Sequence, residues 1–299
     1  MDVCTISRPF LGPTDYDEVR LSLNRCGVVL LRGGNFDLAG FETLTAHFCD
    51  QFHHVGTRYA MRRNQGDGFT TGVPPKNFIL LGHSEGHYRP AFFLPDICFF
   101  MCIVPPSVAG GETTLVDGVE LLRMLPAELC RRLEDVGVIY EFSWEPTRWQ
   151  AEFGVTNEEE LHAFLASFTN ARYTLSDDIL HMFYSAPAIT RARDGSSAFA
   201  NGILAHLPEI DHPRYAGMPV HAKSSNRVYF GDGELINNEV INFLINAHDK
   251  LIYRHRWQLN DVLIVNNTRY MHGREMTAEP CERVLLSRFG CIKEDVFQS

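Results

Sequence analysis

The sequence lacks the features of a nucleic-acid-binding or membrane-spanning protein. Its 299 residues carry a formal net charge of −10 and no run of clustered lysine or arginine, so DNA or RNA would be repelled overall. The most apolar stretch, AFFLPDICFFMCIVPP, is interrupted by Pro95, Asp96 and Pro105 and is too short to cross a bilayer. The first residues, MDVCTISRPF, do not have the basic start and apolar core of a secretory signal. We therefore expect a cytoplasmic protein with no nucleic-acid or membrane partner.

The eight cysteines include no Cys-x-x-Cys pair. Cys98 and Cys102 are four residues apart and could share a metal in a helix, but in a strand they would lie roughly 13 Å apart. We interpret the cysteines as small buried hydrophobic residues in a reducing compartment.

The hydrophobic pattern predicts short strands with inserted helices, without repeats or linkers. Strands are expected in 26–33, 77–85, 97–106, 110–118, 258–267, 269–275 and 281–293, and a hairpin in 188–201 turning at Asp194-Gly195. Helices are expected in 37–52, in 117–135 as two short pieces, in 156–168 with Thr156 and Glu159 as a capping box, and in 237–250, with a loop over 56–76. Because β-α-β alternation is missing, an antiparallel sandwich or barrel is favoured over a doubly wound sheet.

The segment LLGHSEGHYRP carries His83, Glu85 and His87 at alternate positions. In a strand, side chains at i and i+2 share a face roughly 6.6 Å apart, whereas i and i+4 are roughly 13 Å apart. His83 and Glu85 can therefore reach one metal, and His87 is expected to be a polar neighbour or a surface residue. The triplet alone is a weak signal, since a solvent-facing histidine and glutamate at a strand end would look the same.

A second histidine would complete a site of two histidines and one carboxylate, which leaves three positions open on iron. His272 follows the apolar stretch VLIVNN near the end of the chain. Arg283 comes eleven residues later, where a guanidinium could hold the carboxylate of a cosubstrate.

Six motifs occur in order: HSEGHY, GGETTLVDG, RWQAEFG, FGDGELI, VNNTRYMHGRE and RVLLSR. With them the chain resembles the taurine dioxygenase/TfdA-like Fe(II)- and 2-oxoglutarate-dependent oxygenases from about Gly27 to Gly290. The likeness is greatest to the branch of amino-acid hydroxylases in natural-product biosynthesis. The resemblance implies a mainly β fold with inserted helices around a double-stranded β-helix (a cupin-like jelly roll), and we expect residues 1–299 to form one domain.

The resemblance also implies the site: Fe(II) on His83, Glu85 and His272, and 2-oxoglutarate on Thr113 and Arg283, with O₂ as the other cosubstrate. A carboxylate at Glu85 argues against halogenation, because the family's halogenases lack one there. The implied reaction oxidises, most simply by hydroxylation, a C–H bond of an amino acid, its derivative or a carrier-bound aminoacyl group, and releases succinate and CO₂. Epoxidation, desaturation or cyclisation would use the same ligands. Two different kinds of protein would also fit the motifs: a cupin-like enzyme independent of 2-oxoglutarate and a non-catalytic jelly-roll binding protein.

Three further residues are candidates for the substrate site: Tyr88, Arg274 and Arg288. Many family members place a second arginine four residues after the cosubstrate arginine, but Arg288 is five residues after Arg283, which in a regular strand puts it on the opposite face. A bulge could restore it, it could itself be the cosubstrate ligand, or it could be structural. Arg274 could be structural instead, and Tyr88 could be a core residue. Asn266 stands where the family often has aspartate, which we expect to alter only a turn hydrogen bond.

Overall fold

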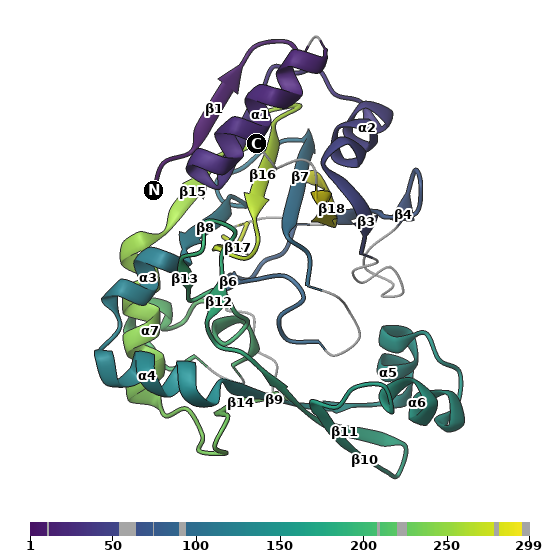
Figure 1. The fold of residues 1–299 in the computed structure, drawn as a ribbon, viewed down its shortest axis with the longest axis vertical. Coiled ribbons are helices and arrows are strands. Elements are labelled where there is room, and N and C mark those ends of the chain that lie inside the picture. Colours follow the sequence, from purple (N-terminus) through teal and green to yellow (C-terminus); the bar gives the residue numbers. More distant parts are fainter. Residues whose placement is uncertain are drawn as a thin grey trace.

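Two β-sheets form the centre of the computed structural model, which describes residues 1–10, 12–53, 64–73, 75–89, 94–207, 210–219, 226–277 and 281–294 (Figure 1). The larger sheet has the spatial order β1 (Cys4–Ser7), β2 (Val28–Arg32), β16 (Val262–Asn266), β7 (Ile97–Val104), β18 (Val284–Ile292), β5 (Thr70–Val73) and β4 (Asn64–Gln65), with β3 (Cys49–Phe52) also beside β18. The smaller sheet has the order β15 (Tyr253–His255), β8 (Thr113–Asp117), β17 (Tyr270–Arg274) and β6 (Leu80–His83). Only the β1–β2 pair among these pairings is parallel, so the expected antiparallel arrangement is confirmed for the described strands.

The two sheets pack face to face, because alternate residues of each strand point to opposite sides. In β2, Val28 and Leu30 join the core between the sheets, where they meet side chains such as Leu115 of the smaller sheet. Val29 and Leu31 point outward into a second core, under α1 (Pro13–Cys26) and α2 (Leu38–Phe48). Both faces of this strand are therefore buried, which explains its continuous apolar run.

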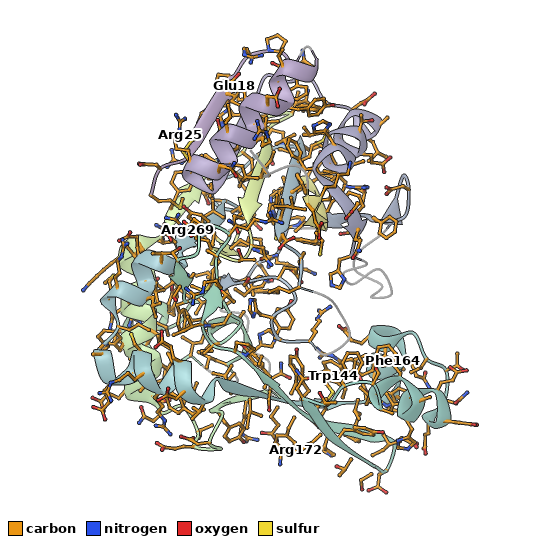
Figure 2. All side chains as sticks on the ribbon, viewed as in Figure 1. Glu18, Arg25, Trp144, Phe164, Arg172 and Arg269 are labelled. Carbon is orange, nitrogen blue, oxygen red and sulfur yellow. A yellow bond between two sulfur atoms is a disulfide. The ribbon has the colours of Figure 1, made fainter. Side chains whose placement is uncertain are left out.

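The outer face of the smaller sheet is covered by α3 (Gly118–Met124) and α7 (Asn238–Leu251), whereas α4 (Ala127–Val136) lies beside a third sheet. The same core continues into this third sheet, which has the order β10 (Ala171–Ser176), β11 (Ile179–Ala186), β9 (Val138–Trp144) and β14 (Arg227–Phe230). Beside this sheet lie α5 (Pro146–Phe153) and α6 (Glu158–Leu165), and Trp144 and Phe164 mark their junction (Figure 2). The ring of Phe153 connects the two, 5.6 Å from the Trp144 ring and 5.2 Å from the Phe164 ring.

Several predicted elements are confirmed, including the two helices of 117–135, the helix from Asn237 and the hairpin of β12 (Thr190–Arg191) and β13 (Ser197–Ala198). Short 3₁₀ turns, η1 (Leu204–His206) and η2 (Pro213–Tyr215), follow this hairpin. The helix expected in 37–52 ends at Phe48, and 49–52 form β3 instead. The loop expected over 56–76 is wrong where β4 and β5 lie, and its residues 56–63 and 74 are outside the described part of the chain.

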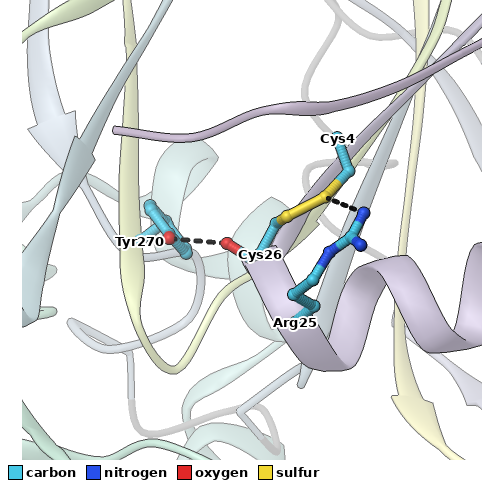
Figure 3. The surroundings of a disulfide bond; sticks show 4 residues. All are labelled: Cys4, Arg25, Cys26 and Tyr270. Carbon is cyan, nitrogen blue, oxygen red and sulfur yellow. Dashed lines mark hydrogen bonds between the residues drawn. A yellow bond between two sulfur atoms is a disulfide. The ribbon is translucent and has the colours of Figure 1, made fainter.

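One prediction about the cysteines is wrong. Cys4 of β1 and Cys26 at the end of α1 form a disulfide (Figure 3), and the Tyr270 hydroxyl donates a hydrogen bond to the Cys26 carbonyl at 2.7 Å. The other six cysteines are free. Cys98 and Cys102 lie in a strand, the arrangement in which they cannot share a metal. None of the described helices has the length and apolar character needed to cross a membrane.

Candidate metal centre and cosubstrate pocket

Three buried side chains converge between the two sheets: His83, Glu85 and His272. The Oε2 atom of Glu85 lies 3.7 Å from His83 Nε2 and 3.8 Å from His272 Nε2, and the two imidazole rings are 4.4 Å apart. One ligand atom from each residue falls within 4.8 Å of the other two. Two histidines and one carboxylate at these separations fit a metal ion with bonds of about 2.1 Å to each.

Strand pairing brings the two histidines together. His83 is the last residue of β6 and His272 is its direct partner on β17. Residues that face each other across antiparallel strands have Cβ atoms about 5 Å apart, close enough to share an ion. Glu85 lies beyond the end of the strand, in a turn, so the expectation that both residues project from one regular strand is wrong in this detail.

His87 lies in the same turn and is buried rather than exposed, so the surface position considered for it is wrong. Burial lowers the pKa of His87 to about 4. Its imidazole is therefore neutral near pH 7, and the group that could hold a metal consists of the other three side chains.

The Glu85 turn is held by Asn267, which lies between β16 and β17. Asn267 Oδ1 accepts from the Glu85 amide at 2.8 Å, and Asn267 Nδ2 donates to the carbonyls of Glu85 and Pro95 at 2.9 and 2.8 Å. The Ser84 amide donates to the Asn201 carbonyl at 2.9 Å. The carboxylate position is thus fixed by residues far away in the sequence.

A cavity opens beside the cluster. It is lined by Val73, Leu80, His83, Glu85, Phe100, Thr113, His272, Gly273, Arg274, Arg283, Leu285 and Phe289. Half of the lining residues are apolar or glycine, and its cationic side chains are two arginines. This composition suits a small anion held close to a metal.

Arg283 is the strongest sign of such an anion. Its side chain is 2% exposed, and neither Nε nor Nη1 has a hydrogen-bond partner among the residues that the structure describes. Burial lowers the pKa of Arg283 to about 10. A buried guanidinium without an acceptor is costly, so these donors fit a bound carboxylate.

Thr113 offers a second donor. Its Oγ1 accepts a hydrogen bond from Trp257 Nε1 at 3.1 Å. An indole can only donate, so the Thr113 hydroxyl proton remains available for an acceptor in the cavity. Trp257 was not singled out from the sequence, because no local pattern indicates that its ring reaches Thr113.

Of the three residues predicted for the substrate site, only Arg274 lines the cavity. Its guanidinium lies 5.1 Å from the centre of the Phe78 ring. Tyr88 is not among the lining residues, and its hydroxyl donates to Glu85 Oε1 at 3.0 Å. Arg288 donates to both carboxylate oxygens of Asp67, at 2.6 and 2.9 Å.

Arg288 points away from the cavity. Leu285 and Phe289 of β18 line the cavity, whereas Arg288 lies opposite Phe99, whose side chain belongs to the outer core. The register of β18 against β7 does shift, but between Val284 and Leu285. This geometry matches the opposite strand face, where a regular strand would put Arg288.

Two histidines and one carboxylate that could hold a metal between antiparallel sheets, with a cavity carrying an arginine beside them, are typical of the class of non-haem Fe(II) oxygenases. The chain belongs to the taurine catabolism dioxygenase TauD, TfdA family, whose model matches residues 5–289. It is a non-haem Fe(II)- and 2-oxoglutarate-dependent dioxygenase with the jelly-roll fold. The predicted family, fold class and cofactors are thereby confirmed.

Individual relatives are distant. The chain is 22% identical to the dapdiamide synthesis protein DdaC of Enterobacter agglomerans over 276 residues. This alignment covers 89% of this chain and 82% of DdaC. PvcB of Pseudomonas aeruginosa has a similar structure, with a TM-score of 0.55, 15% identity and coverage of 94% of this chain and 84% of PvcB. AAD-2, solved with Mn(II) and N-oxalylglycine, also has a TM-score of 0.55 and 15% identity, covering 98% of this chain and 94% of its own. These structural likenesses show the fold.

Proposed function

We propose that His83, Glu85 and His272 hold the Fe(II), that Thr113 and Arg283 hold 2-oxoglutarate, and that the enzyme hydroxylates an amino acid or a related aminoacyl compound. The observation that carries the proposal is the buried Arg283 guanidinium: its Nε and Nη1 have no hydrogen-bond partner among the described residues, and it lines the same cavity as the three proposed metal ligands. A dicarboxylate that spans from the metal to Arg283 would satisfy both ends of this cavity.

Each residue has a defined task in this proposal. Arg283 holds the distal carboxylate by paired hydrogen bonds, and the Thr113 hydroxyl donates to a carboxylate oxygen. Phe100, Leu285 and Phe289 exclude water from the reacting atoms. Bound Fe(II) would let O₂ act as the oxidant: one oxygen atom would convert 2-oxoglutarate to succinate and CO₂, and the other would oxidise the substrate. The protein orients the substrate C–H bond toward that centre.

The substrate class is supported by relatives. DdaC is named for dapdiamide synthesis, and PvcB is described as an oxygenase from an isonitrile synthetic pathway. We therefore propose a small-molecule or carrier-bound substrate in natural-product biosynthesis, used by a cytoplasmic enzyme whose residues 1–299 act as one domain. Arg274 is the cavity cation left to contact a substrate once Arg283 is occupied. Hydroxylation is the first expectation, and epoxidation, desaturation or cyclisation would be seen as different products.

A histidine replacement tests the metal site. We expect His272→Ala to abolish substrate-coupled succinate formation and to weaken Mn(II) binding severely, because one of three ligands is lost. The matched control is His212→Ala, since His212 is also buried but hydrogen-bonds Asn246 instead. The measurements are succinate yield with Fe(II), ascorbate, 2-oxoglutarate and a panel of amino acids and aminoacyl carriers, and Mn(II) affinity by calorimetry. Full turnover by His272→Ala would refute the assignment.

A further inference from the structure

The two carboxylate oxygens of Glu85 have different surroundings. Oε2 faces both histidines, at 3.7 and 3.8 Å from their Nε2 atoms. Oε1 instead accepts a hydrogen bond from the Tyr88 hydroxyl at 3.0 Å. The carboxylate is therefore oriented with one oxygen toward the metal position and the other toward a fixed donor.

We propose that Tyr88 is a positioning residue that restricts Glu85 to binding the metal through Oε2 alone. The inference rests on the proposed metal site, and it goes beyond it by assigning a role to a residue that does not touch metal or cosubstrate. A carboxylate can bind a metal through one oxygen or two. A donor hydrogen-bonded to one oxygen stabilises the one-oxygen mode, as partners of metal ligands commonly do.

Tyr88 is itself held firmly. Its side chain is buried, and its ring packs 4.1 Å from the His206 ring. The Arg89 guanidinium lies 5.1 Å from the centre of the same ring and pairs with the buried Glu152 of α5 at 2.7 Å. Behind the ring, Gly202 leaves room that a side chain would fill, since a Cβ there would lie 2.9 Å from Tyr88 Cδ1. The hydroxyl therefore has little freedom to move away from Glu85.

The restriction matters because three protein ligands would leave positions open on a bound metal for 2-oxoglutarate and O₂. If both oxygens of Glu85 bound the metal, one of these positions would be taken. Loss of the Tyr88 hydroxyl should therefore weaken binding of the cosubstrate. It should also weaken binding of the metal, because a partner that orients the ligand is lost. A residue that merely fills the core would change stability without this effect.

Tyr88→Phe is the direct test, because it removes the hydroxyl and keeps the ring. The matched control is Tyr215→Phe: Tyr215 is similarly buried, and its hydroxyl donates to the Asp249 carboxylate at 2.9 Å. We expect Tyr88→Phe to weaken Mn(II) affinity about 10-fold, the lower end of the usual effect for partners of metal ligands. Affinity of the Mn(II) form for N-oxalylglycine, and the visible absorption of the anaerobic Fe(II)–2-oxoglutarate complex, should fall too. Tyr215→Phe should leave all three within twofold of wild type.

The outcomes are distinguishable. If wild type binds Mn(II) and N-oxalylglycine and Tyr88→Phe binds both within twofold, the role of Tyr88 is refuted while the metal site stands. If wild type binds no Mn(II), the proposed function fails first, and this inference with it. Should Tyr88→Phe not fold, as judged by thermal unfolding, Gly202→Ala replaces it, because the added Cβ displaces the Tyr88 ring. Weaker N-oxalylglycine binding by that variant supports the role, and unchanged binding overturns it.

Discussion

Arg283 and Arg288 are both almost fully buried, yet their surroundings are opposite. Arg288 is 1% exposed and bonded to Asp67 and to Thr70 Oγ1. Arg283 is 2% exposed and, among the described residues, forms no ion pair within 4.0 Å. One arginine therefore stabilises the fold, whereas the other is buried at a cost that a ligand can offset.

Exchange of each arginine for methionine should separate these roles. Arg283→Met should raise the KM for 2-oxoglutarate at least about 10-fold, because a charge-assisted hydrogen-bond pair is worth about 2 kcal/mol. Its unfolding free energy without 2-oxoglutarate should be unchanged or higher, since an uncompensated buried cation is removed. Arg288→Met should instead lose about 1–3 kcal/mol of stability and keep the wild-type KM for 2-oxoglutarate. The measurements are urea unfolding and steady-state kinetics.

If the KM for 2-oxoglutarate rose in Arg288→Met and stayed unchanged in Arg283→Met, the assignment of Arg283 to the cosubstrate and Arg288 to the fold would be contradicted. Both variants replace an arginine with methionine, one just before β18 and one within it, so a non-specific effect of the substitution would change KM and stability alike in both. Opposite changes in KM and stability are expected only if one arginine binds 2-oxoglutarate and the other stabilises the fold.

At the residue scale, the sequence could group His83, Glu85 and His272 because each lies in a recognisable motif. It could not predict that Trp257 supports Thr113 from 144 positions away, or that Asn267 supports Glu85 from 182 positions away. Such contacts depend on which strands become neighbours and on the reach of single side chains. Neither is encoded in local spacing.

Among the structural elements, the turn after β6 depends on the connection between β16 and β17. Asn267 uses both its amide oxygen and its amide nitrogen on the Glu85 backbone. These groups are buried, so loss of the Asn267 side chain would leave unsatisfied donors and acceptors around Glu85, the proposed metal ligand.

We expect Asn267→Ala to lower Mn(II) affinity about 10-fold or more and to cost about 2–3 kcal/mol of unfolding free energy. Asn237→Ala is the matched control, since Asn237 caps α7 by accepting from the Val240 amide at 3.0 Å. That variant should lose about 1 kcal/mol of stability and bind Mn(II) as wild type does. Equal Mn(II) affinities in the two variants would show that Asn267 stabilises the fold without positioning Glu85.

Element prediction failed where the apolar signal was sparse. α1 was not predicted, because its segment PTDYDEVRLSLNRC buries few apolar side chains, notably Val19 and Leu23. In α6 the capping residue is Asn157, which accepts from the Glu160 amide, rather than the predicted Thr156. Thr156 and Asn157 are adjacent and either side chain can cap a helix, so the sequence alone does not fix the first helical residue to within one position.

For the whole molecule, the strand types were predictable but their neighbours were not. β16 lies between β2 and β7, which come from segments more than 150 residues earlier in the chain. The third sheet of β9, β10, β11 and β14 was likewise not predicted, because α5 and α6 separate β9 from β10 in the chain and β14 begins more than 40 residues after β11. Long-range pairing of this kind leaves no periodic signal in a single sequence.

Asp261 joins the two main sheets at one point. It lies just before β16 and accepts two hydrogen bonds from Arg32 of β2, at 2.9 and 2.7 Å. It also lies 3.2 Å from Nε2 of His255 in β15 and accepts from the Gln258 amide at 2.9 Å. Burial alone would raise the pKa of Asp261, but the hydrogen bonds from Arg32, His255 and Gln258 outweigh it and lower that pKa from 3.8 to about 2.

This lowered pKa predicts how global stability depends on pH. The folded pKa lies below the unfolded value, so the contribution of Asp261 is fully present above about pH 4 and is lost as the pH falls toward about 2. Asp261→Asn should therefore lower the unfolding free energy by about 2 kcal/mol at pH 7, and this difference from wild type should shrink below about pH 4. Urea unfolding at stepped pH measures it, with the exposed Asp135→Asn as a control that should show no difference at any pH. A difference for Asp261→Asn that stayed constant on acidification would mean that side-chain packing, rather than the carboxylate charge, joins the sheets here.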